Sequence, residues 1–403
     1  MKIIRQPGYN LNERPFLVIW ETTRACDLAC RHCRAESSPT PDPRSLSFRE
    51  GCGLIDQVDR FGLPHPLFIM TGGDPFKRPD IFELVQYAAG NGIPAALSPS
   101  GTPLLNEENL TKLHESGSRV ISLSLDGSNA ALHDDFRQVR GSFDWTVNGW
   151  KQAQAAGLKL QINTTVTRYN LFDLPAIFSL VRSLGAMTWS IFFLVPTGRG
   201  LQQDEISPQD YEAVLNFLYD ASKFLGIKTT EGHHFKRVVL QRTALEARSI
   251  PPQAALPLNG TYWKLKAELD SLPQPEAVPE AARMKRAPLH VNSANGFVFI
   301  SHLGEVYPSG YLPLSAGNVR KTLLEEIYRD SPLFKTLRDK TQLKGRCGAC
   351  EYKQVCGGSR SRAYAMTGDV MAEEPFCAYQ PGSFPYPEDV RALMDATASM
   401  EQR

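Results

Sequence analysis

Short apolar segments alternate with segments of helical periodicity along the first half of the chain. Apolar runs typical of buried strands occupy residues 16–20, 67–70, 94–97, 120–125, 158–166 and 189–195. Elsewhere apolar residues recur every three or four positions, which predicts helices over 46–61, 79–91, 106–117, 128–137, 143–156, 173–185 and 206–226. Successive strand–helix units of this kind predict a parallel sheet with helices outside it. The six units are fewer than the eight of a closed barrel, so we expect an α/β fold built on a partial, TIM-like barrel.

In the second half of the chain the alternation of apolar strands and periodic helices is weaker. Residues 230–290 are rich in proline, and such a stretch could be a substrate lid or a surface excursion. Two apolar runs, 297–300 and 306–307, predict a hairpin, and helices are expected near 321–338. The expected division is a lead-in (1–15), the partial barrel (16–228), an irregular linker or lid (229–288) and a small C-terminal α+β domain (289–403).

Composition narrows the class of protein. The 403 residues carry 44 basic and 43 acidic side chains, for a net charge of +1, and no block of like charge. Nucleic acid is therefore disfavoured as a main partner, because phosphate binding needs a basic stripe. The chain contains no run of 18 apolar residues and no signal-peptide core, so we expect a cytoplasmic protein without a membrane span.

The cysteines form two groups far apart in sequence. Cys26, Cys30 and Cys33 follow the first predicted strand, and a second group lies near the end of the chain: Cys347, Cys350, Cys356 and Cys377. Cys52 stands alone within a helical pattern and is expected to be a small core residue. In a chain without a signal peptide, such groups indicate metal sites rather than disulfides.

The first group suits an iron–sulfur cluster with an incomplete set of ligands. Three thiolates in one loop can each bind one iron of a cubic [4Fe–4S] cluster, which leaves the fourth iron open to a small chelating molecule. A structural zinc knuckle is the alternative. Spacing, position and the preceding strand together resemble the radical S-adenosylmethionine (SAM) superfamily, which implies that SAM binds the open iron and that the barrel is of the (β/α)6 type.

The same resemblance implies a set of SAM contacts at the ends of the later strands. Gly72, Gly73 and Asp74 resemble the Gly-Gly-Glu motif that receives the SAM amino group, with Asp in place of Glu. Ser124 before Asp126 is expected to hold the SAM carboxylate, and either Arg137 or Arg140 could pair with it. Further expected contacts are Ser98, Ser100, Asn163, Thr165, Val195 beside the adenine, and His32 stacked on it. Strand-end capping or surface exposure explains several of these residues equally well.

The C-terminal cysteines could hold zinc or a fully ligated [4Fe–4S] cluster, and cysteines alone do not separate the two. Together with the first group they resemble the SPASM/twitch auxiliary-cluster domain, which implies one auxiliary cluster. Ser309 and Ser359 stand where members of such families often carry cysteines. Residues 345–352 and 362–369 look like the radical SAM enzymes of haem biosynthesis.

This resemblance implies a radical SAM oxidoreductase or lyase acting on a tetrapyrrole side chain, by oxidative decarboxylation or propionate removal. A 5′-deoxyadenosyl radical from SAM would remove a hydrogen atom, the auxiliary cluster would carry an electron, and ferredoxin or flavodoxin would supply electrons. One alternative is a maturase of a ribosomal peptide, although the 15 lead-in residues look too short for a leader-peptide docking module. The other is a zinc-bound scaffold without catalysis.

Overall fold

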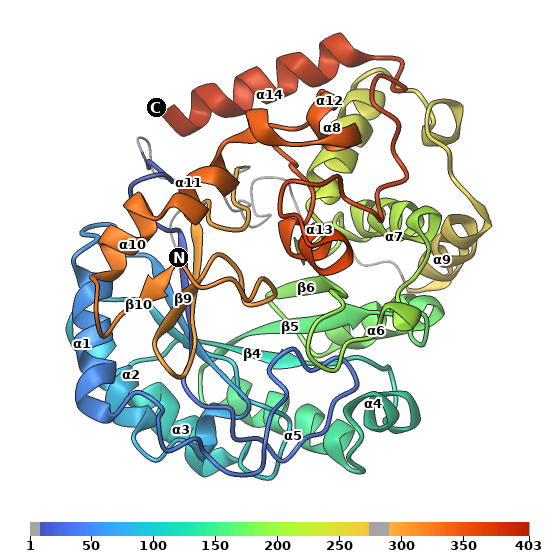
Figure 1. Cartoon of the computed structure of the whole chain (residues 1–403). Coiled ribbons are helices and arrows are strands. Elements are labelled where there is room, and N and C mark those ends of the chain that lie inside the picture. Colours follow the sequence, from blue (N-terminus) through green and yellow to red (C-terminus); the bar gives the residue numbers. More distant parts are fainter. Residues whose placement is uncertain (1–8, 274–289, 403) are drawn as a thin grey trace.

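The protein is built on one continuous sheet of ten strands. The computed structural model describes residues 9–273 and 290–402, and in that part the strand order is β10-β9-β8-β1-β2-β3-β4-β5-β6-β7. Strands β1 to β7 are all parallel to one another. They are β1 (Leu17–Glu21), β2 (Leu67–Thr71), β3 (Ala95–Leu97), β4 (Val120–Ser124), β5 (Lys159–Val166), β6 (Thr188–Phe193) and β7 (Gly226–Thr230). The predicted partial α/β barrel is confirmed (Figure 1).

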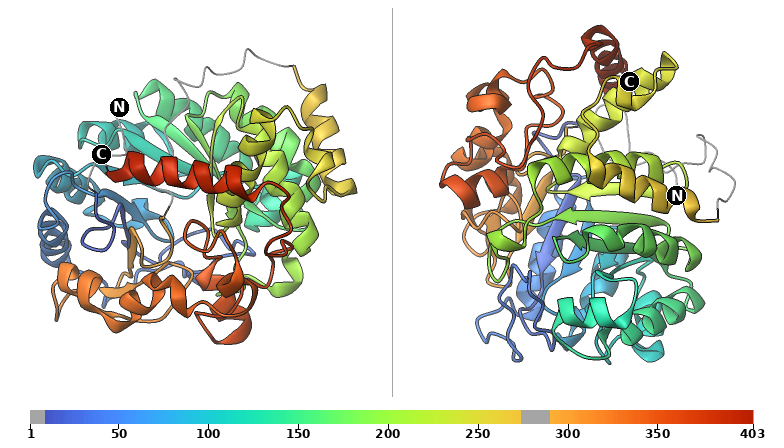
Figure 2. Two further views of the ribbon diagram at one scale, coloured as in Figure 1. Left: turned by 90° about the horizontal axis from the view of Figure 1, so that it is seen from above. Right: turned by 90° about the vertical axis from the view of Figure 1, so that its right-hand side faces the viewer.

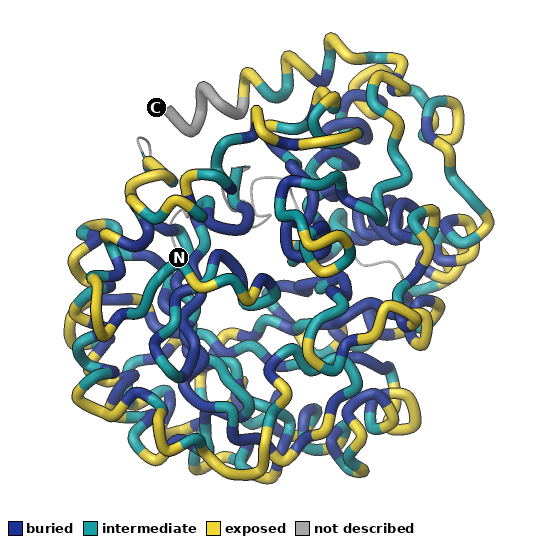
Figure 3. Tube along the Cα trace, viewed as in Figure 1, coloured by how far each residue is buried: buried dark blue, intermediate teal, exposed yellow. Residues whose placement is uncertain are grey.

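Helices between these strands cover the outer side of the curved sheet (Figure 1). They are α1 (Phe48–Asp59), α2 (Ile81–Gly90), α3 (Glu107–Glu115), α4 (Ala130–Arg137), α5 (Ser142–Ala155), α6 (Leu174–Ser183) and α7 (Pro208–Ala221). Helix α1 begins at a capping box, in which the Ser47 side chain accepts from the Glu50 N–H and the Glu50 carboxylate accepts from the Ser47 N–H. Exposed residues concentrate on the outer loops and on the outward sides of helices, and the strands are mostly buried (Figure 3).

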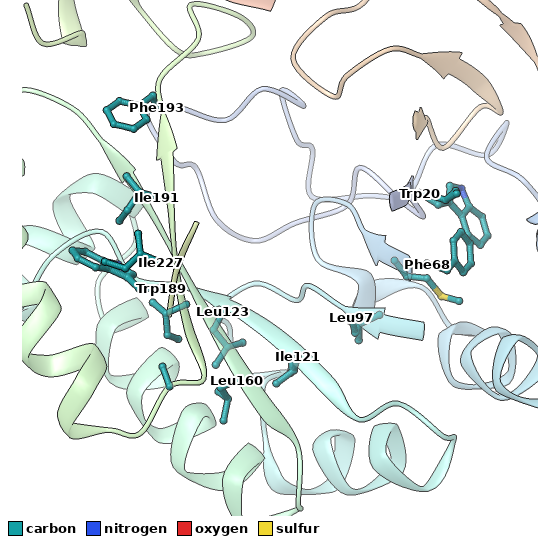
Figure 4. Packing of buried hydrophobic residues seen from close by; sticks show 14 of the residues in the cluster. Trp20, Phe68, Leu97, Ile121, Leu123, Leu160, Trp189, Ile191, Phe193 and Ile227 are labelled. Carbon is teal, nitrogen blue, oxygen red and sulfur yellow. The ribbon is translucent and has the colours of Figure 1, made fainter. Parts of the chain in front are cut away.

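The strands separate apolar and polar side chains between the two faces of the sheet. Leu123, Ile162 and Trp189 are fully or almost fully buried and belong to the core cluster, part of which Figure 4 shows beside the outer helices. Because successive residues of a strand point to opposite faces, the neighbours Ser124, Asn163 and Ser190 point to the concave side. We call this side the barrel lumen. The strand register places Ser124, Asn163 and Ser190 in one row across β4, β5 and β6.

The C-terminal part continues the same sheet past β1. Strand β8 (Phe297–Ile300) pairs in parallel with β1, and β9 (Glu305–Tyr307) returns antiparallel to β8, which confirms the predicted hairpin. Strand β10 (Gly317–Asn318) completes this edge. The helices that follow are α10 (Leu324–Asp330), α11 (Pro332–Arg338), α12 (Gly345–Ala349), α13 (Arg360–Thr367) and α14 (Pro387–Gln402). Helix α14 packs against α8 (His234–Ala247), as Figure 2 shows.

Two sequence expectations fail between residues 206 and 273. The predicted helix 206–226 ends at Ala221, and Gly226–Thr230 forms the edge strand β7 against β6. The stretch expected to be irregular contains α8 and α9 (Gly260–Ser271). Helix α8 has buried residues on several sides, including charged ones, so its apolar period is weak. The rest of the expected linker or lid, 274–288, lies outside the described residues.

Of the lead-in 1–15, the structure describes residues 9–15, which form turns without a helix or strand. Within the described residues, no helix is long and apolar enough to cross a membrane. The predicted domain boundaries at 16, 229 and 289 stay predictions.

Candidate active site at the mouth of the barrel

The turn after β2 packs directly against the loop that carries the first three cysteines. A Cβ atom on Gly72 would lie 2.3 Å from the Thr23 carbonyl oxygen, and one on Gly73 would lie 2.4 Å from that of Ala25. The Gly73 N–H donates to the Thr23 carbonyl at 2.8 Å, and the Asp74 N–H donates to the Ala25 carbonyl at 2.6 Å. Only glycine permits this approach, so the Gly-Gly pair positions the cysteine loop. An incoming amino group is a donor, so only carbonyl oxygens of this turn could receive it.

Asp74 joins the turn after β2 to the loop after β3. Its carboxylate accepts from the Thr102 hydroxyl at 2.7 Å and from the backbone N–H groups of Phe76 and Ser100 at 3.2 and 3.4 Å. The side chain is completely buried, and burial raises the pKa of the carboxyl to about 6. Asp74 is therefore buried in the wall of the site, where its carboxylate holds the two loops together.

The three cysteines of the first loop meet polar groups from three later segments. The Cys26 sulfur lies 3.4 Å from the Ser100 hydroxyl oxygen, and Ser100 also donates to the Gly73 carbonyl at 2.7 Å. The Arg137 guanidinium donates to the Cys30 sulfur at 3.5 Å, and the Cys33 sulfur lies 3.8 Å from the Ser37 hydroxyl oxygen. Cys26 and Cys30 are buried and Cys33 is half-buried. Sulfurs held this way form one wall at the C-terminal ends of the strands.

The structure separates the two candidate arginines. Arg137 is buried, pairs with the buried carboxylate of Asp126 and contacts Cys30, while its Nε has no hydrogen-bond partner among the described residues. Arg140 is exposed. Asp126 in turn accepts from the Thr165 N–H at 2.7 Å, which connects the ends of β4 and β5 to the cysteine loop. Of these two candidates, only Arg137 lies where it can act on the cysteines or a ligand beside them.

The surroundings shift the pKa values of the three thiols in different directions. Burial raises the pKa of Cys26 to about 11 and also raises that of Cys30, although the Arg137 charge opposes the shift at Cys30. Burial alone would raise the pKa of Cys33, but hydrogen bonds from Ser37 and the Arg199 charge together lower it. Because thiolates are the metal-binding form, positive charge is needed to ionise the two buried thiols.

The other predicted contacts line the lumen or its rim. His32 is half-buried, its ring lies 4.6 Å from that of Phe136, and burial holds its pKa well below the usual range, so the imidazole is neutral. The Ser98 hydroxyl bonds Ser122, and the Asn163 side-chain oxygen accepts from Gln161 at 2.7 Å. Ser124 is the neighbour of Asn163 across β4 and β5, and Thr165 and Val195 are buried.

Sequence reasoning missed Arg199, which fixes the last part of the cysteine loop. Its side chain donates to the Cys30 carbonyl at 3.0 Å and to Ser37, and its backbone N–H donates to the Cys33 carbonyl at 3.0 Å. Gly198, with φ +59°, allows the approach, since a Cβ there would lie 2.5 Å from the Cys33 carbonyl oxygen. The Gly-Arg-Gly sequence after β6 was the available signal, but nothing in it indicates what the arginine binds.

The four C-terminal cysteines line one cavity. Cys347, Cys350, Cys356 and Cys377 share it with His234 and Arg237 of α8 and with Glu374. The Glu374 N–H donates to the Cys347 sulfur at 3.2 Å, and the Gly358 N–H donates to the Cys356 sulfur at 3.4 Å. Burial raises the pKa of Cys350 and Cys377 to about 12, and the Arg237 charge partly offsets it. Helix α8 was not predicted, so neither His234 nor Arg237 was found from the sequence.

The two serines at expected cysteine positions bind a carboxylate instead. Ser309, Ser359 and Ser361 all donate hydroxyl hydrogen bonds to the buried side chain of Glu231, which follows β7. Ser359 also caps α13 by accepting from the Arg362 N–H at 3.0 Å. These serines therefore connect the C-terminal segment to the barrel.

Both cysteine groups bring several sulfurs together with donor groups that suit an anionic iron–sulfur cluster. Among the described residues, no three His, Cys, Asp or Glu side chains are arranged around a single metal ion. A cubic cluster needs a different arrangement, because each of its thiolates binds its own iron. Grouped sulfurs, N–H donors to Cys347 and Cys356 and nearby guanidinium groups all suit an anionic cluster.

Known proteins with similar sequences agree with a site of this kind. A model of the radical SAM superfamily matches residues 20–181. An AdoMet-dependent heme synthase of Oleidesulfovibrio alaskensis is 43% identical over 373 residues, which are 92% of this chain and 88% of the relative. One of Methanosarcina barkeri is 38% identical over 374 residues, 92% of this chain and 99% of the relative. The chain belongs to the haem-synthesis branch of the radical SAM superfamily.

As a radical SAM protein, the chain is an enzyme that uses SAM and a [4Fe–4S] cluster. Among solved structures, native anSMEcpe with bound AdoMet has a TM-score of 0.64 at 15% identity, over 96% of this chain and 99% of that one. A likeness at this identity shows a shared fold alone. It supports the radical SAM partial barrel described above.

Proposed function

We propose that this enzyme oxidatively decarboxylates propionate side chains of a tetrapyrrole, using one cluster that binds SAM and a second, auxiliary [4Fe–4S] cluster. The observation that carries the proposal is the pair of cysteine groups. Three sulfurs lie at the barrel mouth beside Ser100 and Arg137, and four line a separate cavity. The relatives that are AdoMet-dependent heme synthases support a tetrapyrrole as substrate.

Cys26, Cys30 and Cys33 would hold the SAM-binding cluster. When bound, this cluster supplies an electron to SAM, and SAM supplies the carbon radical that removes a hydrogen atom from the substrate. Arg137 would neutralise part of the cluster's negative charge through Cys30, while Asp126 keeps the guanidinium in place. The unpartnered Arg137 Nε leaves one donor for the carboxylate of SAM.

The balance of the reaction requires an electron acceptor. A propionate chain that loses a hydrogen atom, then carbon dioxide and one electron, becomes a vinyl group. Cys347, Cys350, Cys356 and Cys377 would hold the auxiliary cluster that takes this electron, and four thiolate ligands suit electron transfer because they leave no iron open. Ferredoxin or flavodoxin is the class of protein we expect to reduce the first cluster.

The two alternatives raised by the sequence have less support. A peptide maturase would share the fold, but relatives at 38–43% identity are heme synthases. A zinc-bound scaffold without catalysis does not agree with membership of a family of radical enzymes.

The test is SAM cleavage by anaerobically reconstituted enzyme. Cys30→Ala removes a sulfur from the first group, and we expect 5′-deoxyadenosine formation to fall to the level measured without protein. Cys52→Ala is the matched control, because Cys52 lies in helix α1, packs against the core and belongs to neither group. Wild-type enzyme with a reductant, SAM and iron coproporphyrin III should also release carbon dioxide, detected as a mass loss in the porphyrin.

Two results would count against the proposal in different ways. Continued SAM cleavage by Cys30→Ala would refute the cluster assignment. Cleavage of SAM without any change in the mass of the porphyrin would refute the substrate.

A further inference from the structure

The edge strand β7 brings a lysine into the barrel lumen. Ile227 is buried in the core cluster with Trp189, and Figure 4 shows both near the outer helices. Lys228 follows Ile227 along the strand and therefore points to the opposite, concave face. Register confirms this, because Lys228 is the cross-strand neighbour of Ser190 and extends the row that begins with Ser124 and Asn163.

Lys228 is enclosed by protein and yet accessible to solvent. Its side chain is exposed, but burial among surrounding protein lowers the pKa of its ammonium group to about 8. Lys228 therefore lies on the concave face with protein around it, but it is not sealed from solvent. Within residues 9–273 and 290–402, burial is the sole cause of this shift, so no nearby carboxylate stabilises the charge.

A second polar group beside Lys228 also lacks a partner. Ser190 is completely buried, and its hydroxyl oxygen makes no hydrogen bond in the part of the chain that the structure describes. A buried hydroxyl without a partner costs free energy, and a ligand that accepts its hydrogen would remove that cost. An unpaired cation and an unpaired hydroxyl, adjacent on neighbouring strands, form a site for an anionic oxygen ligand.

The concave face continues from Lys228 toward the candidate active site. Phe192 points into the lumen from the same strand as Ser190, and its ring lies 6.5 Å from that of Tyr311. Burial raises the pKa of the Tyr311 hydroxyl to about 12, and the charged groups near enough to modify that pKa include Arg34, Glu231 and Cys33. A molecule in the lumen would thus extend from Lys228 past Tyr311 toward the first cysteine loop.

We propose that Lys228 and Ser190 form a subsite that binds a carboxylate of the substrate that is not reacting, and so orients another side chain toward the cysteine loop. This inference rests on the proposed function, since a tetrapyrrole of this class carries several carboxylate side chains. Lys228 is then a specificity-determining residue. A carboxylate could also come from SAM, and the experiment separates the two sources.

The experiment measures binding of iron coproporphyrin III and of SAM, separately, to anaerobically reconstituted enzyme, by optical titration and by equilibrium dialysis. Lys228→Gln should weaken porphyrin binding by about tenfold or more, because a charge-assisted hydrogen bond is lost. Lys228→Arg should retain most of the affinity. SAM binding, and SAM cleavage without porphyrin, should stay unchanged in both variants.

Two controls make the result specific. Lys159→Gln neutralises an exposed lysine at the opposite end of the barrel, on β5, and should bind porphyrin like the wild type. The tetramethyl ester of iron coproporphyrin III carries no free carboxylates, so Lys228→Gln should change its affinity far less than that of the free acid. Iron content and circular dichroism confirm that each variant is folded and loaded.

Three other outcomes are possible, and each refutes a different part of the proposal. Wild-type affinity of Lys228→Gln for the free acid would refute the subsite. Weaker binding of SAM, with unchanged porphyrin binding, would assign the carboxylate to SAM. If the wild type does not bind the porphyrin at all, the proposed function fails and this inference fails with it.

Discussion

Arg137 shows how single residues connect the parts of this active site. Its guanidinium contacts a cysteine of the first loop and pairs with Asp126 at the end of β4. The sequence predicted an arginine at this place but left Arg137 and Arg140 as equal candidates. Burial separates them: Arg137 is the last residue of α4, and Arg140 lies beyond the left-handed residue Gln138, with φ +58°, that ends this helix. No sequence pattern indicates that turn.

Asp74 allows a prediction on pH. Burial raises its pKa from the ordinary 3.8 to about 6, so the folded protein holds this proton more tightly than the unfolded chain does. The stability that Asp74 contributes is therefore complete below pH 3.8 and is lost as the pH rises toward 6. Asp74→Asn stays neutral and can still accept from the Phe76 and Ser100 N–H groups, while the Thr102 hydroxyl can turn to accept from the amide.

The melting temperature of Asp74→Asn, relative to that of the wild type, should therefore increase between pH 4 and pH 6.5. Thermal unfolding of both apo-proteins across this range measures the difference. A difference that stays constant with pH would show that Asp74 titrates as it does in water.

At the scale of elements, the first six strands could be predicted and the seventh could not. The first six carry apolar runs or a clear alternation, and in the structure they lie within a few residues of their expected positions. Strand β7 lies at the edge of the parallel sheet and contains a glycine, Lys228 and two threonines beside its single apolar residue, Ile227, so its apolar signal is weak. Missing β7 also hid the lumen site at Lys228 and the Glu231 cluster beyond it.

Helix α13 depends on the serine that replaces an expected cysteine. Ser359→Ala removes both its N-cap and a hydrogen bond to the buried Glu231 carboxylate. We expect the free energy of unfolding to fall by roughly 2–4 kcal/mol, the sum of a cap and a charge-assisted hydrogen bond. Denaturant titration under anaerobic, reducing conditions measures the change.

Ser383→Ala is the matched control, because Ser383 is exposed and caps no helix. This variant should stay within about 0.5 kcal/mol of the wild type. A similar small loss for Ser359→Ala would mean that the Glu231 cluster does not hold the C-terminal segment to the barrel.

At the scale of the whole molecule, the C-terminal segment adds strands to the barrel sheet and also bonds to the ends of the barrel strands. Strand β8 extends the sheet beyond β1, and Arg362 of α13 donates to the Leu194 carbonyl at 3.0 Å while pairing with the buried carboxylates of Glu205 and Glu374. This network connects the end of β6 to the segment that carries the second cysteine group. A continuous structure of this kind would keep the two cysteine groups at a fixed distance, as the proposed electron transfer requires.

The iron content of the reconstituted protein tests the central claim most directly. With two clusters on the two cysteine groups, the wild type should bind about eight irons per chain. The triple variant Cys26→Ala, Cys30→Ala, Cys33→Ala should bind about four, and so should the variant with all four C-terminal cysteines changed to alanine. A wild type with about four irons, or a count that is unchanged when either group is removed, would contradict the account.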